Sequence, residues 1–139
     1  TKGWIAVEKG GAYANRTEWG DPEQIAIGTA ADPRSTTLHE LQHAIQHREG
    51  WATGGSPKDA SLMPYVRKMY SDNIDQFQGE GHELMNMAKH RAYQNLAGEA
   101  EARATQARIP LDAAQRRALF PEDSYDVPMN QLIVMGLLK

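Results

Sequence analysis

The segment PRSTTLHELQHAIQHREG, residues 33–50, determines how the rest of this sequence is interpreted. Asp32 or Ser35 can cap the N-terminus of a helix, and the proline that starts the segment is tolerated in a first turn. Gly50 is a residue type that commonly ends a helix in the left-handed conformation. The segment therefore predicts one helix over about residues 34–49.

Apolar residues recur along this helix at the three- and four-residue intervals of a stripe that faces the core. They are Leu38, Leu41, Ala44 and Ile45. We expect this face to pack against the hydrophobic core. A helix with such a stripe, a good cap and no internal Pro or Gly provides the geometry that a helical motif needs.

Within the helix, the pentapeptide HELQH combines residue types that bind and use a metal ion. His39 and His43 are four residues apart, so they project from nearly the same face, about 6 Å apart along the axis. Both imidazoles can therefore reach one ion, for which Zn²⁺ is the expected cofactor. Glu40 can sit beside the metal without binding it and take a proton from the attacking water.

Two other interpretations of these residues stay open. The pentapeptide also occurs by chance, in which case His39, Glu40 and His43 are solvated residues of an amphipathic helix. His43 and His47 form a second pair at the same spacing, but Ala44 follows His43 and offers no carboxylate base. We interpret His47 as a surface residue or as a residue that contacts one of the metal-binding side chains.

A catalytic zinc site needs a third protein ligand besides a position for water. Because the sequence has no Cys, that ligand must be a histidine or a carboxylate. Candidates downstream of the motif are Glu80, His82, Glu83, His90, Glu99 and Glu101. Glu99 and Glu101 stand two apart on a predicted helix and point about 160° away from each other, so only one of them can face the metal.

Two motifs, HELQHAIQHREGWATGG and AGEAEAR, together resemble those of the metallopeptidase-like domains associated with large polyvalent proteins of phages and mobile elements. The resemblance covers about residues 25–108. The pair is more distantly similar to gluzincin peptidases, in which the first Glu of an E-x-x-A helix is the third zinc ligand. The resemblance thus implies that Glu99 binds the metal, whereas Glu101 faces away and pairs with Arg103 or a neighbouring helix. Arg103 itself stands where an Asp often follows in gluzincins.

Other residues qualify by type for supporting roles. A donor that stabilises the oxyanion is expected near the metal, and the candidates are Tyr65, His82, His90 and Tyr93. For each of them, core packing or solvent exposure is the competing interpretation. Trp51 can wall a substrate cleft or cover the core, and Gly54 and Gly55 suit either a mobile lip or a plain connecting loop.

The remaining elements are predicted from short patterns. The first thirty residues mix apolar runs, at residues 4–7 and 25–27, with turn signals, which predicts two or three short strands with a turn at Gly10–Gly11. Helices are expected from about Tyr65 to Ile74, from Gly81 to Arg108 with Gly98 as a bend or close contact, and from Ala113 to Leu119 after the cap Asp112. Leu132–Val134 is either a strand that returns to the N-terminal sheet or a helix end.

Bulk properties exclude several classes of protein. The 139 residues suit a single domain, and the formal net charge of −3 gives no indication of nucleic-acid binding. The longest apolar stretch, near the C-terminus, is far short of the roughly 20 residues that span a bilayer. Because the chain begins with Thr1, we expect a domain excised from a larger protein. Its ends do not identify a location, and the resemblance implies the cytoplasm or delivery with a phage or mobile element.

Together these features predict a mostly helical α+β, zincin-like domain over residues 1–139, with a small N-terminal β-sheet and an HExxH active-site helix. The expected activity is hydrolysis of a protein or peptide substrate, with His39, His43 and Glu99 on Zn²⁺ and Glu40 as general base. The alternatives are a non-catalytic zinc-binding or interaction module within a large phage-type polyprotein, and a toxin-like effector protease. The oligomeric state is not predicted.

Overall fold

The structure, a computed structural model, describes residues 10–14, 23–29, 32–76, 79 and 81–135. It is mostly helical with one small antiparallel sheet, which confirms the α+β prediction. The longer elements are β1 (Gly11–Ala14), β2 (Gln24–Ile27), α1 (Pro33–Glu49), α2 (Met63–Asn73), α3 (Gly81–Gln94), α4 (Ala97–Ala107) and α5 (Ala113–Ala118). None of the helices in the described ranges is long and apolar enough to cross a membrane.

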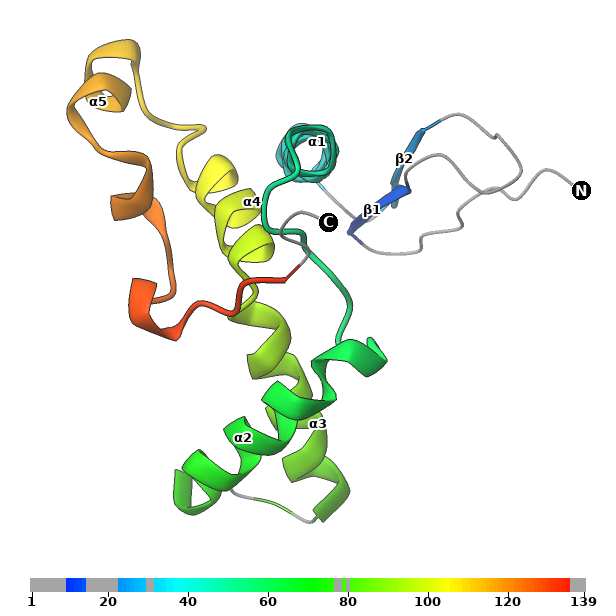
Figure 1. Cartoon of the computed structure of the whole chain (residues 1–139). Coiled ribbons are helices and arrows are strands. Elements are labelled where there is room, and N and C mark those ends of the chain that lie inside the picture. Colours follow the sequence, from blue (N-terminus) through cyan, green and yellow to red (C-terminus); the bar gives the residue numbers. More distant parts are fainter. Residues whose placement is uncertain (1–9, 15–22, 30–31, 77–78, 80, 136–139) are drawn as a thin grey trace, which may run out of the picture.

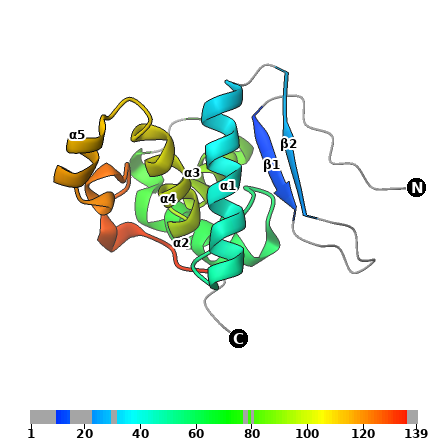
Figure 2. The same cartoon turned by 90° about the horizontal axis from the view of Figure 1, so that it is seen from above.

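Helix α1 lies between the β1–β2 hairpin on one side and α4 on the other, as Figures 1 and 2 show. The two strands pair antiparallel, with Gly11 opposite Ile27 and Ala14 opposite Gln24. The predicted strand at residues 25–27 lies within β2, whereas the run at residues 4–7 falls outside the described residues. The turn expected at Gly10–Gly11 is wrong in part, because β1 begins at Gly11.

The limits of α1 agree with the prediction from its capping residues. The Asp32 side chain accepts a hydrogen bond from the N–H of Arg34, which identifies Asp32 rather than Ser35 as the cap. At the other end Gly50 adopts a left-handed conformation with a φ of 69°, and its N–H donates to the carbonyl of Gln46. The helix that carries the HELQH motif is therefore defined by local chemistry at both ends.

The prediction that the apolar face of α1 packs against the core is wrong. Leu41 and Ile45 are 43% and 46% exposed, whereas the buried residues of the helix are Thr36, Glu40 and Gln46. The reason is that the hairpin and α4 pack against those faces of α1 that carry polar residues. The side chains buried by this packing are therefore polar.

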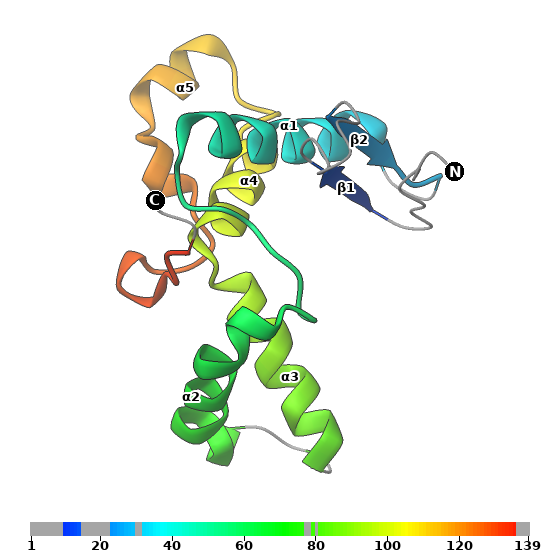
Figure 3. The ribbon, with the colours of Figure 1, turned by 45° about the vertical axis from the view of Figure 1, so that its right-hand side comes forward.

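The hydrophobic core lies mainly between α2 and α3, the pair that extends away from α1 in Figure 3. Its buried members come from these helices and the segments that flank them: Leu62, Val66, Ala88, Ala92, Leu96 and Ile133. Helix α2 ends at Asn73, close to the predicted end, and the alanines of α3 allow the two helices to approach closely.

The helix expected from Gly81 to Arg108 is two helices in the structure, with a break at Asn95 and Leu96. The break exists because Leu96 forms a parallel β-bridge with Ile133. The N–H of Ile133 donates to the carbonyl of Asn95 at 2.7 Å, and the N–H of Ala97 donates to the carbonyl of Ile133 at 2.8 Å. The segment 132–134 thus pairs with the chain between two helices, so neither interpretation of it, as a strand of the N-terminal sheet or as a helix end, is right.

Gly98 is a point of close contact rather than a bend. A Cβ atom added there would collide with the backbone of Thr53 and Gly54, in the loop that follows α1. The absence of a side chain therefore lets the first turn of α4 pack directly on this loop. The contact brings the start of α4 to the second half of α1.

The C-terminal region folds back along α4. Asp112 caps α5 as predicted, and it forms a capping box with Gln115. Farther along, the Arg103 guanidinium on α4 donates to Asp126 at 2.6 and 2.8 Å and to the carbonyl of Gln94 at 2.6 Å. Arg103 thereby ties the last part of the chain to both α3 and α4.

We predict that Gly98→Ala lowers the free energy of unfolding by about 1 to 3 kcal/mol, because the new methyl group must displace the loop backbone. Alanine would otherwise stabilise a helix. The control is Gly81→Ala on α3, where an added Cβ has nothing within 4 Å. Urea unfolding of both variants gives the comparison, and equal stability of the two would contradict the close packing at Gly98.

Asp126→Asn is expected to lower the free energy of unfolding by about 0.5 to 1 kcal/mol near neutral pH, since the pair is partly exposed. The hydrogen bonds from Arg103 hold the pKa of Asp126 below its ordinary value. The stabilisation by the carboxylate is therefore present above the unfolded-state pKa and is lost as the pH falls through the folded-state pKa. Denaturation at several pH values should show the difference between the proteins shrinking in acid, and a constant difference would argue against the ion pair.

Candidate metal centre

Three predicted ligand residues come together between α1 and α4. His39 and His43 project from successive turns of α1, and Glu99 lies in the first turn of α4. The two Nε2 atoms are 3.1 Å apart, and each lies 3.4 Å from a different oxygen of Glu99. These three side chains form a group that can hold a metal ion.

A glutamine on α1 orients the ring of His43. Gln46 is fully buried, and its Nε2 donates to the carbonyl of Gly98 at 2.9 Å and to Glu101 at 2.7 Å. Its amide oxygen consequently faces Nδ1 of His43 at 2.9 Å. An amide oxygen only accepts, so Nδ1 carries the proton and the Nε2 lone pair points into the centre.

The same arrangement occurs at His39 with a glutamine from the other helix. The Nε2 atom of Gln106, on α4, donates to the hydroxyl and the carbonyl oxygens of Ser35 at 2.9 and 3.3 Å. Its amide oxygen lies 3.1 Å from Nδ1 of His39, which again assigns the proton to Nδ1. In their neutral forms, both imidazoles thus present an unprotonated Nε2 to the same point.

Glu99 is 2% exposed and is met by donors from several directions. The N–H of Gly55 donates to Oε1 at 3.0 Å, and the hydroxyl of Tyr93 donates to Oε2 at 2.8 Å. Burial alone would raise the pKa of Glu99, but contacts with His39 and His43 and the Gly55 N–H hold it well below the usual range. The carboxylate is therefore ionised and available as a ligand.

The charge on Glu99 also acts on its neighbours. Burial would lower the pKa of His43, but the contact with the Glu99 carboxylate raises it above the ordinary value. Burial and the same carboxylate both raise the pKa of Tyr93. The Tyr93 hydroxyl therefore stays protonated and remains a hydrogen-bond donor at physiological pH.

Glu40 lies beside the three ligands without being one of them. It is 5% exposed, and the backbone N–H of Tyr13 in β1 donates to its carboxylate. Burial raises the pKa of Glu40, and the nearby His39 and His43 offset part of that rise. Gly11 allows this approach of strand and helix, since a Cβ there would lie 2.6 Å from a Glu40 oxygen.

A cavity of about 550 Å³ opens onto these residues. Its walls are β1, the metal-facing side of α1 and the loop after α1, and its lining includes Tyr13, Glu40, His47, Gly54, Tyr93 and Glu99. Carboxylate, imidazole and hydroxyl groups therefore share one accessible space. Such a concave site with convergent polar groups is the arrangement expected of a binding or catalytic pocket.

Other predicted candidates lie elsewhere. Glu101 faces α1, where it accepts a hydrogen bond from Gln46, while Arg103 pairs with Asp126 instead. His82, Glu83 and His90 are exposed residues of α3 and do not join the group, and Glu80 falls outside the described residues. His47 is exposed at the edge of the cavity, next to Tyr13.

Of the supporting residues, Tyr93, Gly54 and Gly55 line the cavity, whereas Tyr65 and Trp51 line other hollows of the surface. Trp51 is half exposed and belongs neither to the lining of this cavity nor to the hydrophobic core. It therefore has neither of the two predicted roles.

Sequence reasoning missed Gln46 and Gln106, the two residues that set the proton positions on the histidines. Gln46 follows His43 by one helical turn, which is the only sequence signal for its role. No comparable signal exists for Gln106, because its contact joins residues 67 positions apart.

Comparison with known proteins adds no further assignment. No protein-family model matches the chain, and no match was found among curated proteins or solved structures.

Proposed function

We propose that this chain is a zinc-dependent metallopeptidase with a zincin-like, gluzincin-type centre. The observation that carries the proposal is the convergence of His39 and His43 with the buried carboxylate of Glu99. Two imidazoles and one carboxylate are the ligand set of several catalytic zinc sites, which leave a fourth position open.

The spacing of the candidate ligand atoms fits this metal. Tetrahedral ligands about 2.0 to 2.1 Å from zinc lie roughly 3.3 Å from one another. The separations here are 3.1 Å between the two Nε2 atoms and 3.4 Å from each of them to Glu99. The proton positions set by Gln46 and Gln106 also leave both nitrogens free to coordinate.

When bound, zinc would supply a Lewis acid that polarises a substrate carbonyl and acidifies the attacking water. The protein's own part begins with Glu40, whose carboxylate accepts the proton of that water and returns it to the leaving amine. Its raised pKa suits this double role, because a carboxylate with a pKa nearer the working pH is a stronger base and its conjugate acid can still return the proton. Tyr93 lines the same cavity, and its hydroxyl can donate to the developing oxyanion if it turns away from Glu99.

The alternative is a zinc-binding or interaction module without catalysis. Such a structural site is normally closed by four protein ligands. Among the described residues the group has three members and faces an accessible cavity, which favours an enzyme. A protein or peptide substrate is proposed on the strength of the motif and its resemblance alone.

We predict that Glu40→Gln lowers kcat/KM for hydrolysis of a fluorescence-quenched casein by about 10²- to 10⁴-fold, because the amide cannot accept the proton of the water. Zinc content, measured by inductively coupled plasma mass spectrometry, should stay at the wild-type level, since Glu40 is not a ligand.

The matched control is Glu49→Gln, which makes the same change at an exposed position of the same helix and should leave turnover unaltered. Unchanged turnover in Glu40→Gln would exclude the proposed base. Zinc-loaded wild-type protein that cleaves nothing would instead favour the non-catalytic module.

A second pair of variants tests the third ligand. Glu99→Ala should weaken zinc binding by more than about 100-fold, because it removes a direct ligand. Glu101→Ala should weaken binding by less than about tenfold, since Glu101 reaches His43 only through Gln46. Competition titration with a zinc chelator gives both constants, and loss of zinc in Glu101→Ala alone would show that the ligand is misassigned.

A further inference from the structure

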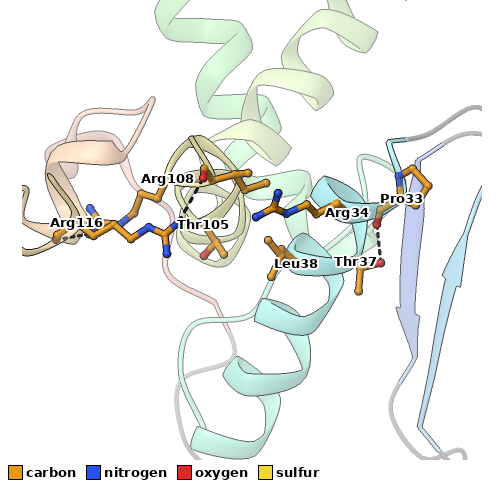
Figure 4. A pocket seen from close by; sticks show the side chains of 8 residues that line it. Pro33, Arg34, Thr37, Leu38, Thr105, Arg108 and Arg116 are labelled. Carbon is orange, nitrogen blue, oxygen red and sulfur yellow. Dashed lines mark hydrogen bonds between the residues drawn. The ribbon is translucent and has the colours of Figure 1, made fainter. Parts of the chain in front are cut away.

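A second pocket, of about 720 Å³, lies away from the metal centre, where the start of α1 faces the end of α4. Figure 4 shows the Arg34 side chain extending from α1 toward the side on which Arg108 and Arg116 lie. Leu38 and Ile109 supply apolar walls between these arginines. We call this the arginine pocket.

The positive charges of the arginine pocket have no negative partner in the described part of the chain. No Asp or Glu lines the pocket, and none of its three guanidinium groups forms an ion pair with a described residue. Arg108 donates to the carbonyls of Leu119 and Arg116, and Arg116 donates to the carbonyl of Ile109. Neutral backbone groups therefore hold the side chains of Arg108 and Arg116 in place. The exposed Arg34 guanidinium has no described partner at all.

This concentration of charge contrasts with the rest of the molecule. The chain carries a formal net charge of −3, so its overall field repels anions. An anionic group that binds must therefore be held by local contacts, and guanidinium forks are well suited to hold a carboxylate. The arginine pocket thus has the chemistry of an acceptor site for acidic groups.

An apolar strip continues from the arginine pocket along α1. Leu38 lines the pocket, and Leu41 and Ile45 follow on the same face, 43% and 46% exposed. The strip extends for about 10 Å along the helix, at 1.5 Å per residue. Leu41 and Ile45 point about 160° away from His43, so this face is separate from the metal centre.

From this combination we propose that the arginine pocket and the apolar strip form a docking site for an acidic, amphipathic segment of a partner protein. Acidic side chains of that segment would pair with Arg34 and its neighbours, while its apolar side chains would cover Leu41 and Ile45. A small anion would need only the arginines, whereas the strip calls for a ligand with several apolar side chains.

The experiment uses fluorescence anisotropy with a short fluorescein-labelled peptide of repeating Glu-Glu-Leu-Leu sequence. The titration is done in EDTA, so that neither cleavage nor the metal centre contributes. Binding is expected, and it should weaken at least about tenfold when the ionic strength rises from about 0.05 to about 0.5 M. Matched peptides in which Lys replaces Glu, or Ser replaces Leu, should bind at least about tenfold more weakly.

Variants then locate the site on the protein. Arg34→Glu should weaken binding about tenfold or more, and so should the double variant Leu41→Ser, Ile45→Ser. All three residues are exposed, so the fold should tolerate these changes, which a thermal melt verifies. Arg67→Glu, an equal charge change on the exposed face of α2, should alter binding by less than about twofold.

Three results would overturn the proposal. The first is no binding of the Glu-Leu peptide, and the second is binding that Arg34→Glu and Arg67→Glu weaken equally. The third is tighter binding of a single-stranded oligonucleotide of equal charge that Arg34→Glu also abolishes, because that would identify a phosphate site instead.

Discussion

The carboxylate of Glu99, almost fully removed from solvent, is the constraint on which the rest of the structure depends. A buried charge is tolerated only when polar neighbours offset its loss of solvent, and here these neighbours come from separate parts of the chain. His39 and His43 face it from α1, Gly55 from the loop that follows, and Tyr93 from the end of α3. To satisfy one side chain, the fold must therefore hold α1, α3, α4 and a loop in a single arrangement.

This demand explains why α1 departs from the usual design of an amphipathic helix. Its buried residues, Thr36, Glu40 and Gln46, are polar, whereas Leu41 and Ile45 are exposed. Hydrophobic stabilisation is supplied elsewhere, between α2 and α3 and under Ile133. The molecule thus separates the part that supplies hydrophobic stability from the part that holds the polar side chains of the candidate metal centre, and the usual pattern of a core-facing helix fails in that second part.

What could be predicted from the sequence follows the same division. The limits of α1 and the pairing of His39 with His43 depend on residues within a few turns, so local patterns sufficed. Glu99 was expected only through resemblance to a motif. The break at Leu96 and the contact of Gln106 depend on segments that meet only in the folded chain, and periodicity contains no information about such meetings.

Gln46 has a consequence for how such a chain can change over evolutionary time. Its side chain joins His43 to Gly98 and Glu101, 52 and 55 positions farther along the chain. Each residue of a helix advances by 1.5 Å and turns by about 100°, so one residue inserted between His39 and Gln46, or between Gly98 and Gln106, would rotate part of the centre out of reach. Helices α2 and α3 extend away from α1 in Figure 3, so a change in the length of the connection between them would leave the spacing of residues within α1 and α4 unchanged. Descendants of this chain are therefore expected to differ in that connection while keeping the count of residues within each helical block.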